Sequence, residues 1–306
     1  MYIEKNWDWD VKYPVVNISF GSGTRKNAKE LRNGIDYILS NNAEKYNITL
    51  NQIEIPDRFS ELIKKLYQKT NQLVVVLIDE YDKPLLDNLT KEVAEELRDE
   101  LSSFYSVLKE ASSFLKFVFL TGVSKFSKTS LFSKLNNLTD ISLVAKYADI
   151  CGLTQKDIDT VFTEYLIDVD KATLKKWYDG YNFRGSDLYN PYDLLMFLWE
   201  KEYKAYWFKT GTPTFLLDLI KKRKFYIPLL ENIKISESQM EDFDIDKVEL
   251  DVLLFQTGYL TIRNYYQVGS KYIYNLRFPN LEVKMGFNDY LLRMFYAAGA
   301  HSNERT

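Results

Sequence analysis

Three acidic residues follow a short apolar run in the first half of the chain. The run Leu73–Ile78 leads directly into Asp79 and Glu80, and Asp82 comes two residues later. An apolar strand that ends in Asp-Glu is typical of nucleotide hydrolases, where the first acid orients metal-bound water and the second polarises the attacking water. The pattern therefore predicts a hydrolytic site that uses Mg²⁺, and a polar turn continued by Lys83-Pro84 is the alternative interpretation.

The apolar run has the features of a buried strand. It is short, rich in β-branched residues and apolar at consecutive positions, which is typical of a strand covered on both faces in a parallel sheet. Unpaired acids are costly to bury, so we expect Asp79, Glu80 and Asp82 where the strand leaves the core. Ligands of open α/β sheets bind beyond the carboxyl ends of the strands, which is where these acids are predicted to lie.

A second apolar strand is predicted over Phe114–Val123, and it contains Thr121-Gly122 near its end. In a parallel sheet this strand is expected to neighbour the acidic one, which places Thr121 beside Asp79 and Glu80. A hydroxyl group there can sense a terminal phosphate. A polar strand end leading into a loop remains an equal alternative.

An earlier strand over Tyr13–Phe20 ends in the loop Gly21–Lys26, with the sequence GSGTRK. A phosphate-binding loop needs the pattern G-x-x-x-x-G-K-[ST], and the dipeptide Gly-Lys occurs nowhere in the chain. The loop is therefore interpreted as a flexible connection from strand to helix.

Composition excludes several classes of protein. The chain has 306 residues with 40 Lys plus Arg against 43 Asp plus Glu, so its formal net charge is −3 and no global basic field indicates nucleic-acid binding. With a single histidine, His301, neither a His-rich metal site nor a Ser-His-Asp triad is expected. The single cysteine, Cys151, excludes an internal disulfide framework. No apolar run is long enough to span a membrane, and we expect a cytoplasmic protein.

Apolar spacing predicts the helices that would support the sheet. They cover Lys26–Ser40, a segment opened by Pro56, and Lys91–Glu110. The stripe of the second helix comprises Phe59, Leu62, Ile63 and Leu66. A further short strand is predicted at Ile141–Val144.

From Thr154 the chain changes character and becomes helical. Thr154 and Asp157 form a predicted capping box, and Asn190-Pro191 begins another helix. The segments Leu260–Ile262 and Tyr272–Leu276 alternate like a hairpin after a helix, which suggests a winged-helix unit. The tripeptide Glu282-Val283-Lys284 resembles the last part of a nuclease signature, but we interpret it as the start of a helix.

A basic cluster follows a predicted helix around Phe215–Ile220. Such residues at a helix C-terminus complement its dipole, and they can also contact phosphates of DNA or RNA. The cluster comprises Lys221, Lys222, Arg223 and Lys224.

Several blocks together resemble the bacterial AAA-ATPase-like family, whose members often carry a restriction-endonuclease-like domain at the C-terminus. The resemblance spans roughly Trp7–Val283, and the order of the blocks makes it specific. The blocks read IDEYDKPLLDN, FYSVLKEASSFLKFVFLTGVSKFSKTSLFSKLNNLTDISL, WYDGYNF, YNPYDLL, YWFKTGTPTFL and LLFQTGYLTI.

The resemblance implies an α/β fold with a P-loop-NTPase-like parallel sheet core, a helical lid and a winged-helix-like segment. The expected divisions are 1–153 for the core, 154–204 for the lid, 205–285 for the winged-helix-like segment and 286–306 for a C-terminal tail. The implied cofactors are ATP and Mg²⁺.

The resemblance also assigns residue roles. Asp79 becomes the Walker B carboxylate associated with magnesium, Glu80 the catalytic base and Thr121 a sensor that contacts nucleotide. Lys125 lies in a strongly patterned block and is taken as a candidate nucleotide-binding residue. Asp82 and Arg98 receive no firm role.

Family members begin with a strand and a phosphate-binding loop, and neither that stretch nor a nuclease domain is found in the 306 residues. We therefore expect impaired ATP hydrolysis and an unpaired edge in the sheet. Two alternatives remain: a DNA- or protein-binding module that uses the winged-helix-like segment, and a metal-dependent nuclease that uses Asp79, Glu80 and Asp82 alone.

Overall fold

The computed structural model describes residues 2–88, 92–124, 131, 135, 137–211, 233–241 and 249–300. The chain divides into two compact units, residues 1–138 and 139–306, which are described separately. The sequence prediction places its first boundary after residue 153, and the division into lid, winged-helix-like segment and tail stays a prediction. Within the described ranges, no helix is both long and apolar enough to cross a bilayer.

The first unit contains a parallel sheet with strand order β1-β2-β3. Its strands are β1 (Val15–Ser19), β2 (Val74–Asp79) and β3 (Leu115–Leu120). All three strands were predicted, as was the adjacency of β2 and β3, and the α/β class is confirmed. Among the described strands β3 pairs on one side only, and Phe117 on it is 53% exposed.

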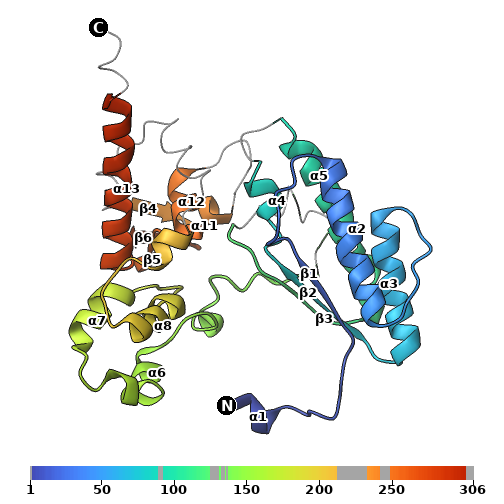
Figure 1. The fold of residues 1–306 in the computed structure, drawn as a ribbon, viewed down its shortest axis with the longest axis horizontal. Coiled ribbons are helices and arrows are strands. Elements are labelled where there is room, and N and C mark those ends of the chain that lie inside the picture. The colour runs from blue at the N-terminus through green and yellow to red at the C-terminus, as the bar shows by residue number, and fades with distance from the viewer. Residues whose placement is uncertain are drawn as a thin grey trace. The chain divides into compact units, whose positions relative to one another are not determined.

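Three helices lie along one face of this sheet (Figure 1). They are α2 (Ala28–Lys45), α3 (Ile55–Thr70) and α5 (Ala94–Glu110). The predicted stripe of α3, from Phe59 to Leu66, is fully buried. Shorter helices at α1 (Tyr2–Asn6), α4 (Lys83–Leu86) and η1 (Ser112–Phe114) complete the described elements of the unit.

Alternate residues of β2 point in opposite directions. Val74, Val76 and Ile78 are buried, whereas Val75 and Leu77 are half-buried. The prediction of a strand covered on both faces is therefore wrong in part, because helices cover fully only the face that carries Val74, Val76 and Ile78.

The second unit begins with a helical region around an aromatic and aliphatic core. Its elements are η2 (Ala145–Tyr147), α6 (Gln155–Thr160), η3 (Thr163–Leu166), α7 (Lys171–Tyr178), α8 (Pro191–Glu200) and α9 (Trp207–Gly211). The predicted capping box at Thr154 and Asp157 is present, and Asn190 caps α8 through its side chain. Tyr178, Tyr189 and Phe197 are among the buried residues that join these helices.

The predicted strand at Ile141–Val144 is wrong. This segment forms a turn, in which Val144 N donates to Ile141 O at 3.2 Å. A four-residue segment with three apolar residues, Ile141, Leu143 and Val144, does not distinguish a strand from a turn, because the partner strand supplies the stabilising ladder.

A second sheet follows, and it is antiparallel with strand order β4-β6-β5. Its strands are β4 (Ile233–Ser236), β5 (Thr261–Val268) and β6 (Lys271–Arg277). The hairpin of β5 and β6 was predicted, and β4 was not. The neighbouring helices are α11 (Glu237–Glu241) and α12 (Leu250–Gln256).

The last described element is α13 (Leu281–Ala300), and Glu282 lies in its first turn as the sequence predicted. Residues 286–300 therefore continue this helix. Val283, Phe287 and Leu291 explain the continuation, because they are buried at a spacing of one helical turn.

Candidate functional site

The acids of β2 lie at the carboxyl end of the parallel sheet. Asp79 is the last residue of the strand and is exposed, and Glu80 follows it half-exposed. Glu80 has φ of 53°, in the left-handed region that non-glycine residues rarely adopt. This local strain turns the chain sharply after the strand, and strained residues cluster at functional sites.

Thr121 lies next to Asp79, as the sequence predicted from the adjacency of the two strands. Ile78 pairs with Leu120 across the sheet, so both chains leave it at the same level. Thr121 Oγ1 donates a hydrogen bond to Asp79 Oδ1 at 2.7 Å, and Thr121 N donates to Ile78 O at 2.8 Å. The hydroxyl therefore fixes the orientation of the Asp79 carboxylate.

The loop after β1 reaches the same place. Phe20 N donates to Asp79 O at 3.1 Å, which carries the loop that begins at Gly21 past the acids. A Cβ atom at Gly21 would lie 3.3 Å from Glu80 Oε1. Glycine at this position leaves room beside the Glu80 carboxylate, a point that sequence reasoning missed because it interpreted the loop as a connection only.

One cation lies near Glu80. Lys83 Nζ is 3.9 Å from Glu80 Oε2 and 4.0 Å from Asp87 Oδ2. At these distances, and with all three side chains partly exposed, the pairs contribute little to stability. Lys83 begins α4, so its position follows from the turn that Glu80 starts.

Asp82 does not join the exposed acids. Its side chain is fully buried and accepts hydrogen bonds from Val123 N at 3.2 Å, from Ser124 Oγ at 2.6 Å and from Ser124 N. The expectation that all three acids emerge from the core is therefore wrong for Asp82. Donors from the loop after β3 offset the cost of burying its carboxylate. Without such partners, burial of the charged group would be strongly unfavourable.

The position of Asp82 has two consequences. Burial raises the pKa of Asp82, and the hydrogen bonds from Ser124 and Val123 oppose that rise. The carboxylate holds the segment from Thr121 to Ser124 against β2, and a Cβ atom at Gly122 would lie 2.5 Å from Asp82 Oδ1. Asp82 is therefore a positioning residue for the loop that carries Thr121.

Two tyrosines reinforce this connection. Tyr81 Oη donates to Ser124 O at 2.6 Å, and Tyr105 Oη of α5 donates to Tyr81 O at 2.9 Å. Burial raises the pKa of Tyr105 well above its ordinary value, so its hydroxyl stays a donor. The sheet edge is thus fixed from β2, β3 and α5 together.

A comparison with protein families gives a match for the first unit. Residues 1–132 match the family model described as Predicted AAA-ATPase. This segment is similar to the AAA-ATPase-like family. It contains the exposed acids, Thr121 and Asp82, so the candidate site lies within the matched part of the chain.

One curated relative extends the similarity through both units. It is described as "Uncharacterized protein in vnfD 5'region" from Azotobacter chroococcum mcd 1, and it is 44% identical over 293 residues. The aligned part covers 95% of this chain and 57% of the relative, so the chain spans little more than half of that protein's length. No solved structure matches the chain.

Several residues with predicted binding roles fall outside the described ranges. Lys125 is one of them, and so is the basic cluster Lys221, Lys222, Arg223 and Lys224. Their proposed contacts with nucleotide or nucleic acid stay predictions.

Among the described residues no group of three or more Asp, Glu, His or Cys side chains could hold a metal ion. Asp82 does not join Asp79 and Glu80 in such a group, since its side chain faces the loop after β3. A nuclease site of three carboxylates is therefore not formed there.

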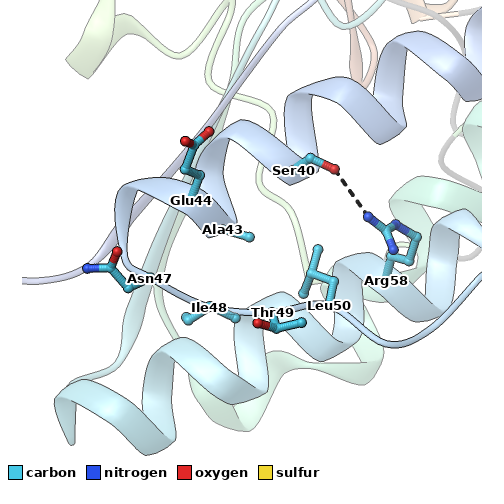
Figure 2. A pocket seen from close by; sticks show the side chains of 8 residues that line it. All are labelled: Ser40, Ala43, Glu44, Asn47, Ile48, Thr49, Leu50 and Arg58. Atoms are coloured by element: carbon cyan, nitrogen blue, oxygen red, sulfur yellow. Dashed lines mark hydrogen bonds between the residues drawn. The ribbon is translucent and has the colours of Figure 1, made fainter.

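A groove of about 550 Å³ lies at the C-terminal end of α2 (Figure 2). Its polar wall is built around Arg58, which donates to Ser40 Oγ at 3.2 Å and to Gln52 O at 2.8 Å and pairs with Asp36 at 2.6 Å. The guanidinium is already paired within the protein, so Arg58 is not a free cation for a ligand, and Glu44 is the other charged residue of the lining. Its lining is completed by Ala43, Glu44, Asn47, Ile48, Thr49 and Leu50.

The second unit presents a different kind of surface on the hairpin of β5 and β6. Arg263, Lys271 and Arg277 are its charged residues, and it contains no Asp or Glu. Tyr265 and Tyr266 are 42% and 44% exposed. The guanidinium of Arg184 lies 4.2 Å from the ring centroid of Tyr272 and 5.0 Å from that of Tyr265. This is a basic, aromatic surface built around cation–π contacts.

Proposed function

We propose that the first unit supplies half of a site for Mg²⁺ and ATP, with Asp79 as the metal-associated carboxylate, Glu80 as the general base and Thr121 as the sensor. The single observation that carries the proposal is the hydrogen bond from Thr121 Oγ1 to Asp79 Oδ1 at the carboxyl end of the sheet. The match of residues 1–132 to the AAA-ATPase-like family model supports the same assignment.

The donor set fits the group that the family implies. Mg²⁺ prefers oxygen ligands, and it is usually held by one or two carboxylates together with substrate phosphates and water. Asp79 and Glu80 are exposed and half-exposed carboxylates at one sheet edge, and Gly21 leaves room beside Glu80. When bound, Mg²⁺ would neutralise charge on the terminal phosphates.

The residues of the chain have separable tasks in this proposal. Asp79 is held in one orientation by Thr121, and within the described ranges no hydrogen bond to its second oxygen, Oδ2, is seen. The turn at Glu80 directs its carboxylate toward Gly21, where it would accept a proton from an attacking water. Asp82 keeps the Thr121 loop in register with β2.

We expect weak nucleotide affinity for these 306 residues alone. Backbone amides and a lysine of a phosphate-binding loop supply much of the affinity in such enzymes, and no Gly-Lys step is present here. The edge of β3, which is unpaired among the described strands, is compatible with a further strand there. The lone cysteine Cys151 is exposed and free, which supports the cytoplasmic location that we propose.

Binding of a fluorescent ATP analogue tests the site directly. We expect Mg²⁺-dependent binding that Asp79→Asn weakens by about tenfold, the effect of losing roughly 1.4 kcal/mol. Glu80→Gln should leave binding within about twofold and abolish any hydrolysis, because a base acts in the reaction and contributes little to ground-state affinity. Asp99→Asn is the matched control, since Asp99 is an exposed acid on α5. Binding that is unchanged in Asp79→Asn would refute the assignment.

A second candidate function is nucleic-acid binding by the β5–β6 hairpin, which is the alternative that its charge and exposed tyrosines favour. Aromatic rings can stack on bases and basic side chains can contact phosphates. Binding of a labelled single strand should weaken in the double variant Tyr265→Ala with Tyr266→Ala, and its affinity should fall as salt rises. The control is Tyr37→Ala in the first unit, which removes an exposed ring elsewhere. Equal losses in both variants would contradict a hairpin surface.

A further inference from the structure

The second unit buries two carboxyl side chains against each other. Asp193 of α8 and Glu282 of α13 both have 0% exposed surface, and the contact between their side chains changes the pKa of each. Asp193 Oδ2 and Glu282 Oε2 receive no bond from any N–H or other hydroxyl donor in the described part of the chain. Ionised carboxylates only accept hydrogen bonds, so a bond between them requires a proton.

The remaining oxygens of the pair hold the start of α9. Trp207 N donates to Asp193 Oδ1 at 2.8 Å, and Phe208 N donates to Glu282 Oε1 at 3.0 Å. The first amides of a helix have no partner within the helix, so these bonds satisfy donors that burial would otherwise leave unpaired. The pair thus connects α8, α9 and α13.

We propose that Asp193 and Glu282 share a single proton, and that loss of this proton at rising pH loosens the packing of α8, α9 and α13. The two side chains are called the carboxyl clasp below. With the proton, the clasp carries one negative charge that the two backbone amides stabilise. Without it, two negative charges face each other in a buried site, which is strongly unfavourable.

The surroundings of the carboxyl clasp offer no cation to relieve that repulsion. No ion pair from Lys or Arg reaches either carboxyl in the described ranges, and Lys209 of α9 and Lys284 of α13 have exposed side chains. The other titratable groups that face the pair are Tyr178 and Tyr181, and burial raises the pKa of both. Their hydroxyls therefore stay neutral where the clasp titrates.

The direction of the pH effect follows from these contacts. Burial, reinforced by the contact with Asp193, raises the pKa of Glu282, and burial likewise raises the pKa of Asp193. In the unfolded chain both carboxyls lose their protons near pH 4. Above that pH the folded state binds one proton more than the unfolded state, so its stability falls as pH rises.

Unfolding of the full chain in urea between about pH 5 and about pH 8 tests the proposal, because one proton changes the folded-to-unfolded ratio about tenfold per pH unit. Trp177, Trp199 and Trp207 make intrinsic fluorescence a signal from the second unit. Glu282→Gln keeps a donor toward Asp193 and removes the shared proton. We expect its pH slope to be shallower than that of the unmodified chain by close to one proton.

Asp193→Asn is the second variant, and it should flatten the profile in the same way if Glu282→Gln fails to fold. Glu164→Gln, which alters an exposed acid of the same unit, should leave the slope unchanged. Infrared spectra give an independent readout: a protonated carboxyl band near neutral pH should disappear in Glu282→Gln. Parallel pH profiles for the unmodified chain and the clasp variants, or a band that persists in both, would overturn the proposal. These outcomes do not depend on nucleotide binding by the first unit.

Discussion

The two units each hold a pair of carboxyl groups, and the pairs lie in opposite environments. Asp79 and Glu80 are at the open end of a parallel sheet, where solvent reaches them, and among the described residues Thr121 is a close side-chain donor to Asp79. Asp193 and Glu282 are fully buried and, in our proposal, share one proton. Exposure therefore decides what the same functional group can do: the first pair is suited to ligands, and the second to holding helices together.

Asp82 is an intermediate case that explains the difference. It is as buried as the carboxyl clasp, but it faces donors of the loop after β3. A buried carboxylate with several donors can remain charged, whereas two buried carboxyls that face each other cannot both do so. The number of nearby donors, together with burial, thus separates a positioning residue from a proton-sharing pair.

The largest expected effect comes from truncating Glu282 in the buried pair, with Glu80 of the exposed pair as the comparison. Glu282→Ala should lower the free energy of unfolding by about 3 kcal/mol, because it leaves the Phe208 amide without its acceptor and Asp193 as a buried charge. Glu80→Ala should change it by less than about 0.5 kcal/mol, because Glu80 is half-exposed and weakly paired. Urea denaturation followed by circular dichroism measures both. Similar losses in the two variants would remove the contrast between the pairs.

A smaller effect is expected at Asp82. Asp82→Ala should cost about 2 kcal/mol, because the amides of Val123 and Ser124 lose their buried acceptor. Amide hydrogen exchange at these two positions should speed up relative to Asp99→Ala, which removes an exposed acid from α5. Unchanged exchange at Val123 and Ser124 would show that Asp82 does not hold the loop.

A small effect on stability, below that at Asp82, is expected at Thr121. Thr121→Val should cost less than about 1 kcal/mol, since the lost hydrogen bond is exposed to solvent. If the exposed pair is built for a ligand, the same change should still weaken Mg²⁺-dependent nucleotide binding measurably, because Asp79 loses the donor that orients it. A large loss of stability with unchanged binding would reverse the distinction drawn between the exposed and buried pairs. Thermal unfolding measures the loss of stability, and nucleotide titration of the same protein sample measures the loss of binding.

The sequence by itself determined the parallel strands, the helices around Phe59 and Leu97, the caps at Thr154 and Asn190, and the start of a helix at Glu282. These features follow from local periodicity and from side chains that bond to their own backbone, so neighbours in the chain are sufficient to predict them. The adjacency of Thr121 and Asp79 was also predictable, because parallel strands bring their carboxyl ends to one edge.

Only the tertiary structure decided which acids are buried or exposed and which short segments form strands. The turn at Ile141–Val144 and the strand β4 depend on whether a partner strand is present, which no local pattern encodes. Asp79, Asp82, Asp193 and Glu282 are chemically similar in the sequence, but they differ in burial and in the donors that surround them. The charge of a carboxyl group depends on desolvation and on contacts between residues far apart in the chain, and both arise only when the units fold.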